Sequence, residues 1–402
     1  MQEASPSMQH RIDKKSGNKL SILGFGCMRF PRKNLSQIDT EKTEQLILSA
    51  FQNGINYFDS AFTYAGSEEI LGRIIKENDL RGKIFIATKL PLIKFRKYRD
   101  FNSIFNTQLE RLQTDYIDYY LLHSLCDTGL WKTLCGIGIE RWIEEKKKSG
   151  QIKNIGFSFH GKQNEFNLLL DSYEWDFCQI QYNYININYQ AGAAGLKKAA
   201  EKGLSVFVME PLLGGKLAAS LPKRALKAFK SVNKTLSPAA WALRWLWNQN
   251  EVTLVLSGMN SQQQLDENIK TAASSSADML KEEEKKAYNS VIKIFNDCCK
   301  IKCTECNYCM PCPNNVNIPG CFAAFNLSYT VGMYSGVQQY LTSTGVNDPR
   351  INYAAGNCTK CGECEKRCPQ HIPIIKMLKK VSKRMESFWV KLALKLLDKF
   401  KR

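Results

Sequence analysis

Residues 56–64 read NYFDSAFTY, and the helical stretch SEEILGRIIKEND (67–79) follows almost at once. Asn-Tyr-Phe has the composition of a β-strand that enters a core, but this strand runs into the carboxylate of Asp59. Because burial of an unpaired carboxylate is costly, Asp59 is expected to have a charged partner or a chemical role. The alternative is that Asp59 only caps the N-terminus of the next helix.

The same order of strand and helix recurs along the first 280 residues. Helical stretches such as TEKTEQLILSAFQNG (40–54) and IERWIEEKKKSG (139–150) separate the strands. Alternation of this kind predicts parallel pairing through helical crossovers, and eight units predict an α/β fold, the closed (β/α)₈ TIM barrel. The eight predicted strands are LSILGFGCM (20–28), NYFDSA (56–61), KIFIATK (83–89), YIDYYLLH (116–123), IKNIGFSF (152–159), FCQIQYN (177–183), LSVFVMEPL (204–212) and TLVLSGM (253–259).

A doubly wound Rossmann sheet is the competing arrangement. The two Gly-x-Gly stretches, GFGCMR (24–29) and GIGIER (136–141), both lack the third glycine of the dinucleotide-binding fingerprint. Neither has a clear strand-to-helix setting. The barrel is therefore the predicted fold.

Composition limits the class of protein. The chain of 402 residues has 56 basic and 38 acidic residues, a net charge of +18, and 44% hydrophobic residues, as a globular protein has. The polar N-terminus lacks the apolar stretch of a signal peptide, and no run reaches the roughly 18 apolar residues of a membrane span, so we expect a cytoplasmic protein. The positive charge is spread without a nucleic-acid-binding motif, and no nucleic-acid partner is expected.

Four polar residues come at the ends of predicted strands. Asp59 and Tyr64 follow the second strand, Lys89 ends the third and His123 ends the fourth. Barrel chemistry lies at the C-terminal ends of the strands, so these side chains should converge. Asp59 would hold Lys89 charged, and an ammonium beside a phenol favours the ionised phenol and lowers its pKa. Tyr64 could then give a proton to a carbonyl oxygen during hydride attack, while His123 orients that carbonyl.

The stretches DSAFTYAGSEEILG, FIATKL, DYYLLH, IGFSFH, QIQYN and ENI resemble the aldo-keto reductases over roughly residues 10–275. The resemblance implies an oxidoreductase that interconverts a carbonyl and an alcohol with NADP or NAD lying across the barrel mouth. It places Asp59, Tyr64, Lys89 and His123 in the catalytic tetrad. By the same match, Ser158 and Gln179 hold the nicotinamide carboxamide, and Glu267 and Asn268 belong to the loop at the adenosine phosphate.

The chain also departs from the family pattern. Phe159 and then His160 stand where many members carry asparagine, and Met209 stands where they stack a tyrosine under the nicotinamide. Gly258, Asn260 and Gln264 replace basic residues of the phosphate-gripping loop. Without a guanidinium or ammonium a 2′-phosphate loses charge-assisted contacts, so the preference between NADPH and NADH stays open.

Eleven of the fifteen cysteines fall between Cys298 and Cys368, which indicates metal ligation rather than disulfides. The blocks CTECNYCMPCPNNVNIP (303–319) and CTKCGECEKRCPQHIP (358–373) form a pseudo-repeat that resembles the paired motif of ferredoxins with two 4Fe-4S clusters. In such motifs three closely spaced thiolates bind one cluster and the fourth reaches the other. The resemblance assigns Cys303, Cys306, Cys309 and Cys368 to one cluster and Cys358, Cys361, Cys364 and Cys312 to the other.

Two alternatives accompany this assignment. Paired C-x₂-C motifs also form zinc sites. The first block is one residue short before Cys312, so Cys298, Cys299 or Cys321 could take its place. Between the blocks, CFAAFNLSY (321–329) and SGVQQYLTS (335–343) indicate a mostly α-helical ferredoxin-type domain.

The expected organisation is a barrel at 1–280, an iron–sulfur domain at 281–375 and a basic amphipathic C-terminal helix at 376–402. The helix could pack on its own protein, dock onto a redox partner or lie on an anionic membrane surface. The main hypothesis is a reductase or dehydrogenase of small carbonyl or alcohol substrates joined to an electron-transfer module. The other is a redox-sensing or docking protein with a non-catalytic barrel. The apolar side chains expected to share one face of the tail are Phe388, Trp389, Leu392, Leu396 and Phe400.

Overall fold

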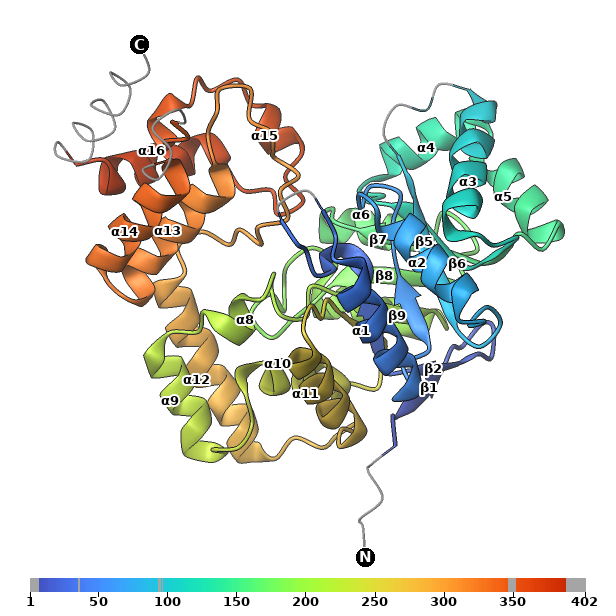
Figure 1. Ribbon diagram of the computed structural model, residues 1–402, viewed down its shortest axis with the longest axis horizontal. Helices are drawn as coiled ribbons and strands as arrows, with labels where there is room; N and C mark the ends of the chain where they lie inside the picture. Colours follow the sequence, from blue (N-terminus) through green and yellow to red (C-terminus); the bar gives the residue numbers. More distant parts are fainter. Residues whose placement is uncertain (1–6, 35–36, 93–94, 96, 346–351, 388–402) are drawn as a thin grey trace, which may run out of the picture. The chain divides into compact units, whose positions relative to one another are not determined.

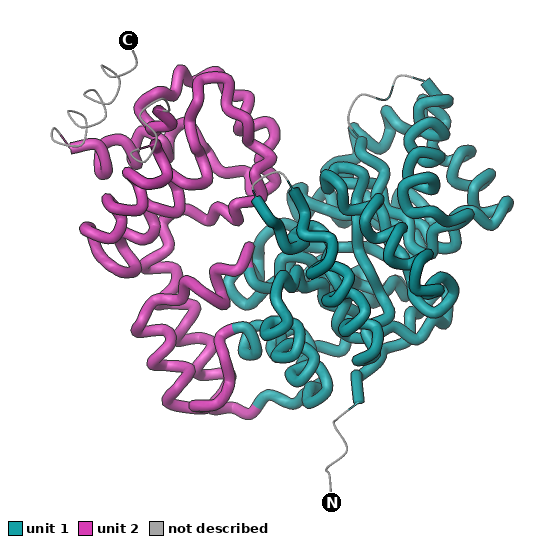
Figure 2. The backbone as a smooth tube through the Cα atoms, viewed as in Figure 1, with its two compact units in different colours: residues 1–212, 239–280 teal, residues 213–238, 281–402 magenta. Residues whose placement is uncertain are grey.

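The computed structural model describes residues 7–34, 37–92, 95, 97–345 and 352–387. The chain divides into two compact units, which Figure 2 distinguishes by colour. Unit 1 comprises residues 1–212 and 239–280, and unit 2 comprises residues 213–238 and 281–402. The expected barrel range of 1–280 therefore includes one segment, 213–238, that the structure groups with the second unit.

Unit 1 is a closed barrel of parallel strands, which confirms the predicted fold (Figure 1). The strands follow one another around the barrel in chain order, and the last pairs with the first. The barrel strands are β3 (Leu23–Gly26), β4 (Tyr57–Asp59), β5 (Phe85–Pro91), β6 (Ile117–His123), β7 (Ile152–Phe159), β8 (Phe177–Gln181), β9 (Ser205–Met209) and β10 (Val252–Ser257).

Side chains alternate along each strand between the barrel interior and the surrounding helices. Tyr57 and Tyr119 belong to the interior cluster, and their ring centroids lie 5.2 Å apart. The next residue along β4, Phe58, belongs instead to the cluster beneath the helices. Because the period is two, Asp59 lies on the same side of β4 as Tyr57, and His123 lies on the same side of β6 as Tyr119. The alternation thus directs these polar groups to the interior at the C-terminal end.

Helices cover the outside of the barrel, and their apolar faces pack on the strands. The predicted helical stretches are present, together with α4 and α6, which the sequence had not indicated as clearly. The helices of unit 1 are α1 (Thr40–Gln52), α2 (Ser67–Glu77), α3 (Tyr98–Leu112), α4 (Thr128–Ile137), α5 (Ile139–Lys148), α6 (Gln163–Leu170), α7 (Gly192–Glu201), α10 (Pro238–Trp247) and α11 (Gln262–Ala273), with a short 3₁₀ turn η1 (Cys27–Arg29).

The predicted first strand, 20–28, is broken in two. Its beginning is β2 (Lys19–Ser21), which pairs antiparallel with β1 (His10–Ile12), and only β3 enters the barrel. The hydroxyl of Tyr119 donates to Asp13 Oδ2 at 2.8 Å, and Asp13 Oδ1 accepts from Ser205 Oγ at 2.6 Å. The hairpin therefore closes the N-terminal end of the barrel, opposite the end at which the strand-terminal polar residues lie.

Unit 2 is helical, as predicted. Its apolar core includes Ile301, Val316, Phe322 and Leu378, and its longest helix, α12, packs against α9, where the rings of Phe229 and Tyr288 lie 5.5 Å apart. The helices are α8 (Lys216–Ala219), α9 (Lys223–Val232), α12 (Glu282–Cys298), α13 (Ile318–Thr330), α14 (Met333–Thr344), α15 (Glu363–Lys366) and α16 (Ile374–Met385), with a 3₁₀ turn η2 (Ala355–Asn357).

The predicted C-terminal helix falls partly on α16, where Leu378 and Val381 face the core and Lys379 and Lys383 are exposed. The five apolar residues expected to share one face of the tail, Phe388 to Phe400, lie outside the described residues. None of the described helices is both long enough and apolar enough to cross a membrane.

Candidate functional site

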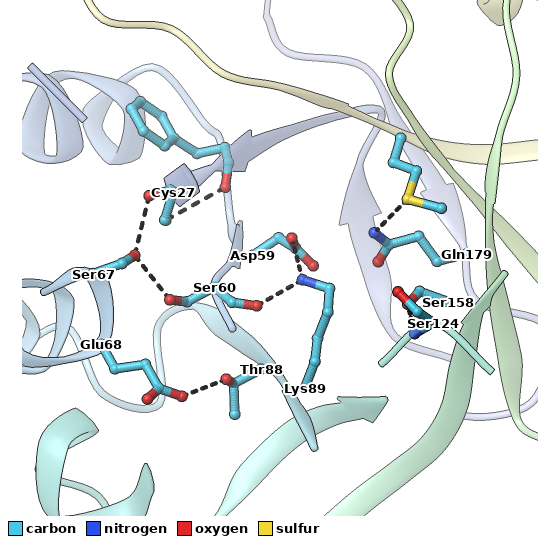
Figure 3. A network of polar contacts seen from close by, with 12 residues as sticks. Cys27, Asp59, Ser60, Ser67, Glu68, Thr88, Lys89, Ser124, Ser158 and Gln179 are labelled. Atoms are coloured by element: carbon cyan, nitrogen blue, oxygen red, sulfur yellow. Dashed lines mark hydrogen bonds and ion pairs between the residues drawn. The ribbon is translucent and has the colours of Figure 1, made fainter. Parts of the chain in front are cut away.

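A buried ion pair lies at the C-terminal end of the barrel strands (Figure 3). Lys89 Nζ donates to Asp59 Oδ1 at 2.5 Å and to the carbonyl oxygen of Ser60 at 2.6 Å. The two charged side chains are 1% and 5% exposed. Burial raises the pKa of Asp59, and Lys89 opposes that rise. The N-cap of α2 is Gly66, so Asp59 does not cap this helix and the alternative reading of it is wrong.

Tyr64 and His123 lie beside this pair. Tyr64 is in the loop between β4 and α2, and Lys89 Nζ lies 5.1 Å from the centroid of its ring. The rings of Tyr64 and His123 meet edge to face at 6.0 Å. Burial, followed by the charges of Lys89 and His160, holds the pKa of His123 well below its ordinary value. The imidazole is therefore neutral, and the structure brings the four predicted residues together.

A second polar network holds the backbone of Lys89. The carboxylate of Glu68 is buried and accepts from Thr88 Oγ1 at 2.6 Å and from Gln108 Nε2 at 2.7 Å. Gln108 Nε2 also lies 3.2 Å from the carbonyl oxygen of Lys89, and Tyr120 donates to Gln108 Oε1 at 2.6 Å. Buried and well paired, this network fixes the strand from which the ammonium projects.

Ser158 and Gln179 are register partners on β7 and β8 and are both buried. Ser158 Oγ accepts from the backbone N–H of Ser124 at 2.8 Å. Gln179 Nε2 points at Met209 Sδ, 3.5 Å away (Figure 3), whereas its Oε1 has no hydrogen-bond partner among the described residues. A buried amide oxygen without a partner is uncommon, and it suits a site that binds a polar ligand group.

Glu267 and Asn268 lie on α11. Asn268 is buried, and its Nδ2 donates to Ser257 Oγ at 3.1 Å, which connects α11 to the end of β10. Glu267 is half-buried. Gly258 lies against the side chain of Arg29, whose Cβ is 3.6 Å from the position of a Cβ at residue 258. The aliphatic part of an arginine side chain thus lies against this loop from a distant part of the sequence, which the loop's own composition did not indicate.

The cysteines of unit 2 line two separate cavities. The first is lined by Cys303, Cys306, Cys309 and Cys368, together with apolar residues such as Ile318 and Phe322. The second is lined by Cys312, Cys358, Cys361 and Cys364. Among the described residues the thiols surround these cavities and do not converge on the position of a single metal ion. Each cavity has four thiols, and three of each four come from one block, as in the predicted grouping.

The three other candidate ligands are placed differently. Cys298, Cys299 and Cys321 line neither cavity. Cys321 is buried on α13, with its sulfur 3.9 Å from the carbonyl oxygen of Tyr353. His371 is exposed and likewise lines neither cavity.

Comparison with known proteins agrees with both parts of this structure. Residues 22–287 match the aldo/keto reductase family, which is more than half of the chain. The chain belongs to the aldo/keto reductase family. Residues 302–372 of this aldo/keto reductase match the 4Fe-4S dicluster domain, so it is an oxidoreductase barrel fused to an iron–sulfur module.

Individual relatives cover the barrel. An aldo-keto reductase of Mycolicibacterium vanbaalenii is 27% identical over 63% of this chain and 82% of its own length. The L-galactose dehydrogenase of Arabidopsis thaliana is also 27% identical, over 63% of this chain and 85% of its own. Among solved structures, the holo form of the aldo-keto reductase AKR11C1 from Bacillus halodurans has a TM-score of 0.59 at 26% identity, covering 71% of this chain and 96% of that one.

Two functional candidates of this aldo/keto reductase were not predicted. Glu210 follows β9 with a φ of 53°, and burial raises its pKa to about 7 while Arg29 opposes the rise. The signal was present, because Glu210 follows an apolar strand just as Asp59 does. Glu68 lies on α2 three residues before Leu71 and seven before Ile75, and this spacing places it on the buried face of the helix. Helical periodicity could therefore have identified Glu68.

Proposed function

We propose that this aldo/keto reductase interconverts a carbonyl compound and the corresponding alcohol with a nicotinamide nucleotide. The observation that carries the proposal is the buried ion pair of Lys89 and Asp59 beside the ring of Tyr64. An ammonium held at this place stabilises negative charge that develops on the phenol oxygen, and Asp59 keeps the ammonium in position.

The four residues have separate roles in this proposal. A bound nicotinamide nucleotide supplies the hydride for reduction and accepts it in the reverse direction. The Tyr64 hydroxyl gives its proton to the carbonyl oxygen, which becomes the alcohol oxygen. Neutral His123 donates a hydrogen bond that orients the carbonyl, a role that its lowered pKa supports because the imidazole carries no charge of its own. Glu68 and Gln108 position Lys89 through its backbone.

We further propose that Ser158 and Gln179 hold the nicotinamide carboxamide. The unpartnered, buried Oε1 of Gln179 supports this role, since it can accept from an amide N–H. Glu267 and Asn268 are proposed for the adenosine end. The Arg29 side chain lies beside Gly258, so its charge is a candidate contact of a 2′-phosphate, and the cofactor is NADP or NAD.

In unit 2 we propose two 4Fe-4S clusters, with Cys303, Cys306, Cys309 and Cys368 as ligands of one and Cys312, Cys358, Cys361 and Cys364 as ligands of the other. The two separate cavities, each lined by four thiols, support this assignment. Clusters of this kind transfer one electron at a time, whereas a hydride carries two. We therefore propose an external redox partner, and a cytoplasmic location in which the thiols stay reduced.

The test of the barrel chemistry is the variant Tyr64→Phe, assayed without oxygen against aldehydes, ketones and alcohols with NADPH and NADH. Loss of one hydroxyl should reduce turnover by about 10²–10⁴-fold, the usual contribution of a general acid. Tyr116→Phe is the matched control, because Tyr116 comes just before β6 begins, at the opposite end of the barrel. Wild-type turnover in Tyr64→Phe would refute the catalytic proposal and favour a sensing or docking role.

The test of the cluster assignment is iron and sulfide content after anaerobic purification. The wild type should contain about eight irons, as two four-iron clusters require. Cys312→Ala should lose iron, whereas Cys321→Ala should keep the full complement because Cys321 lines neither cavity. The reverse pattern would show that the fourth ligand was assigned wrongly.

A further inference from the structure

The segment between β9 and α10 contributes to the environment of the first cysteine cavity. Residues 213–238 belong to the same unit as the cysteines. Gly214 has a φ of +68°, and a Cβ at this position would lie 2.3 Å from the carbonyl oxygen of Thr304. The backbone at residue 214 therefore approaches the backbone of Cys303–Glu305 more closely than any residue with a side chain could.

Lys216, two residues later, is a buried cation. Its side chain is 11% exposed, and its Nζ is buried without a hydrogen-bond partner among the described residues. Among the described residues it pairs with one carboxylate oxygen, Glu305 Oε1 at 3.6 Å, on a side chain that is 45% exposed. Burial of an ammonium with one distant and solvated counter-charge is unfavourable. As with Asp59, a second partner of opposite charge is expected.

The first cavity can provide that charge. The ammonium of Lys216 contacts Glu305, which stands between the cavity-lining residues Thr304 and Cys306. The backbone N–H of Glu305 also points at Cys303 Sγ, 3.4 Å away. Both groups favour negative charge at this sulfur, which is the charge that a thiolate ligand and its cluster would carry.

The second cavity has a different environment. Lys366, two residues after Cys364, is 70% exposed, and its ammonium pairs with Glu363 Oε1 at 2.6 Å, so this cation is solvated and has its own counter-charge. Cys361 of this cavity is exposed. The pseudo-repeat of the sequence thus contains two cluster sites that differ in electrostatic surroundings.

We propose that Lys216 is a built-in positive charge of the first cluster site, which raises the reduction potential of that cluster. The proposal rests on the cluster assignment given above. Reduction adds one electron to the cluster, without forming or breaking a bond, so a nearby cation stabilises the reduced form.

The test is an anaerobic titration of the whole protein with dithionite as the electron donor, followed by absorbance and by electron paramagnetic resonance. Lys216→Gln keeps the length of the side chain and removes its charge. It should weaken electron binding at one cluster by about tenfold, which is about 59 mV for a one-electron couple, and leave the other cluster unchanged. Lys216→Arg should stay close to the wild type. Lys227→Gln is the matched control, an exposed lysine on α9 of the same segment.

Glu305→Gln gives an independent measurement, because removal of the counter-charge should shift the same midpoint upward. The proposal is overturned if Lys216→Gln keeps its full iron content and both midpoints are those of the wild type. If Lys216→Gln loses iron, Glu305→Gln becomes the deciding variant. An unchanged or lowered midpoint potential in Glu305→Gln then overturns the proposal. Iron and sulfide content of the wild type tests the cluster assignment separately, before any variant is compared.

Discussion

The buried pair of Asp59 and Lys89 makes a prediction that needs no substrate. Lys89→Met removes the only group that donates a hydrogen bond to the Asp59 carboxylate, since Asp59 Oδ2 has no hydrogen-bond partner among the described residues. Removal of one member of a buried pair usually costs about 3–5 kcal/mol, because the other charge is left uncompensated. In a domain of roughly 250 residues, each kcal/mol lowers Tm by about 2 °C, so we expect a decrease of about 6–10 °C.

The double variant Asp59→Asn/Lys89→Met distinguishes the interaction between the two side chains from the effect of losing each one alone. Asp59→Asn alone leaves a buried ammonium without its counter-charge, so it should also be destabilised. In the double variant neither charge remains, and its loss of stability should be smaller than the sum of the two single losses by about 1–3 kcal/mol. Tryptophan fluorescence follows the barrel, because every tryptophan except Trp389 lies in unit 1.

The pH dependence of Lys89→Met has a definite sign. Burial already raises the pKa of Asp59, and loss of Lys89 removes the group that opposes this rise. A carboxyl group whose pKa is raised on folding stabilises the protein at low pH, and this stability is lost as pH rises from the unfolded value of about 3.9 through the folded one. The deficit of Lys89→Met should therefore be smaller at low pH than at high pH. For the pair itself, the reasoning is refuted if the stability losses of Asp59→Asn and Lys89→Met add up to the loss of the double variant within about 0.5 kcal/mol.

Two further predictions concern Glu210 and Gly214. Burial raises the pKa of Glu210 to about 7. The Tm of the wild type should therefore fall relative to the Tm of Glu210→Gln as pH rises from about 4.5 to about 7, and the difference should then level off. A difference in Tm that stays constant across this range would contradict the assigned burial. Gly214→Ala should displace the Thr304 loop and lower the iron content, because its Cβ would lie 2.3 Å from a carbonyl oxygen. Gly215→Ala is the control, since Gly215 also has a positive φ, of 92°, but has no atom within 4 Å of its Cβ position; equal iron loss in both would mean that strain, and not contact with Thr304, is responsible.

The barrel and its central polar residues could be predicted because both follow from one repeated pattern. Eight apolar strands separated by helices determine the topology, and a polar residue at a strand end is placed at the C-terminal end by that topology alone. Asp59, Lys89 and His123 all satisfy this rule, and so does Glu210, which was passed over. Burial at such positions is then a consequence of the two-residue period along each strand.

Contacts between distant loops could not be predicted in this way. The hairpin that contains β2 is joined to the barrel at Asp13, which accepts hydrogen bonds from Tyr119 and Ser205 far along the chain. Likewise, Arg29 reaches Gly258 from the start of the barrel. The periods of strands and helices determine which face of an element a residue occupies, but they do not determine which loops contact one another.

Lys216 shows the same limit in the second unit. Nothing near it in the sequence distinguishes PLLGGKLAAS from an ordinary barrel loop, and its partner residues come about 90 positions later, in a cysteine block that spacing alone assigns to metal binding. The close approach of Gly214 to Thr304 places the Lys216 ammonium near the cysteine block. Because this ammonium is buried, it requires a counter-charge. Lys216 thus corresponds to Asp59 with the signs exchanged, because a buried charge with an insufficient counter-charge indicates that a group of opposite charge binds nearby.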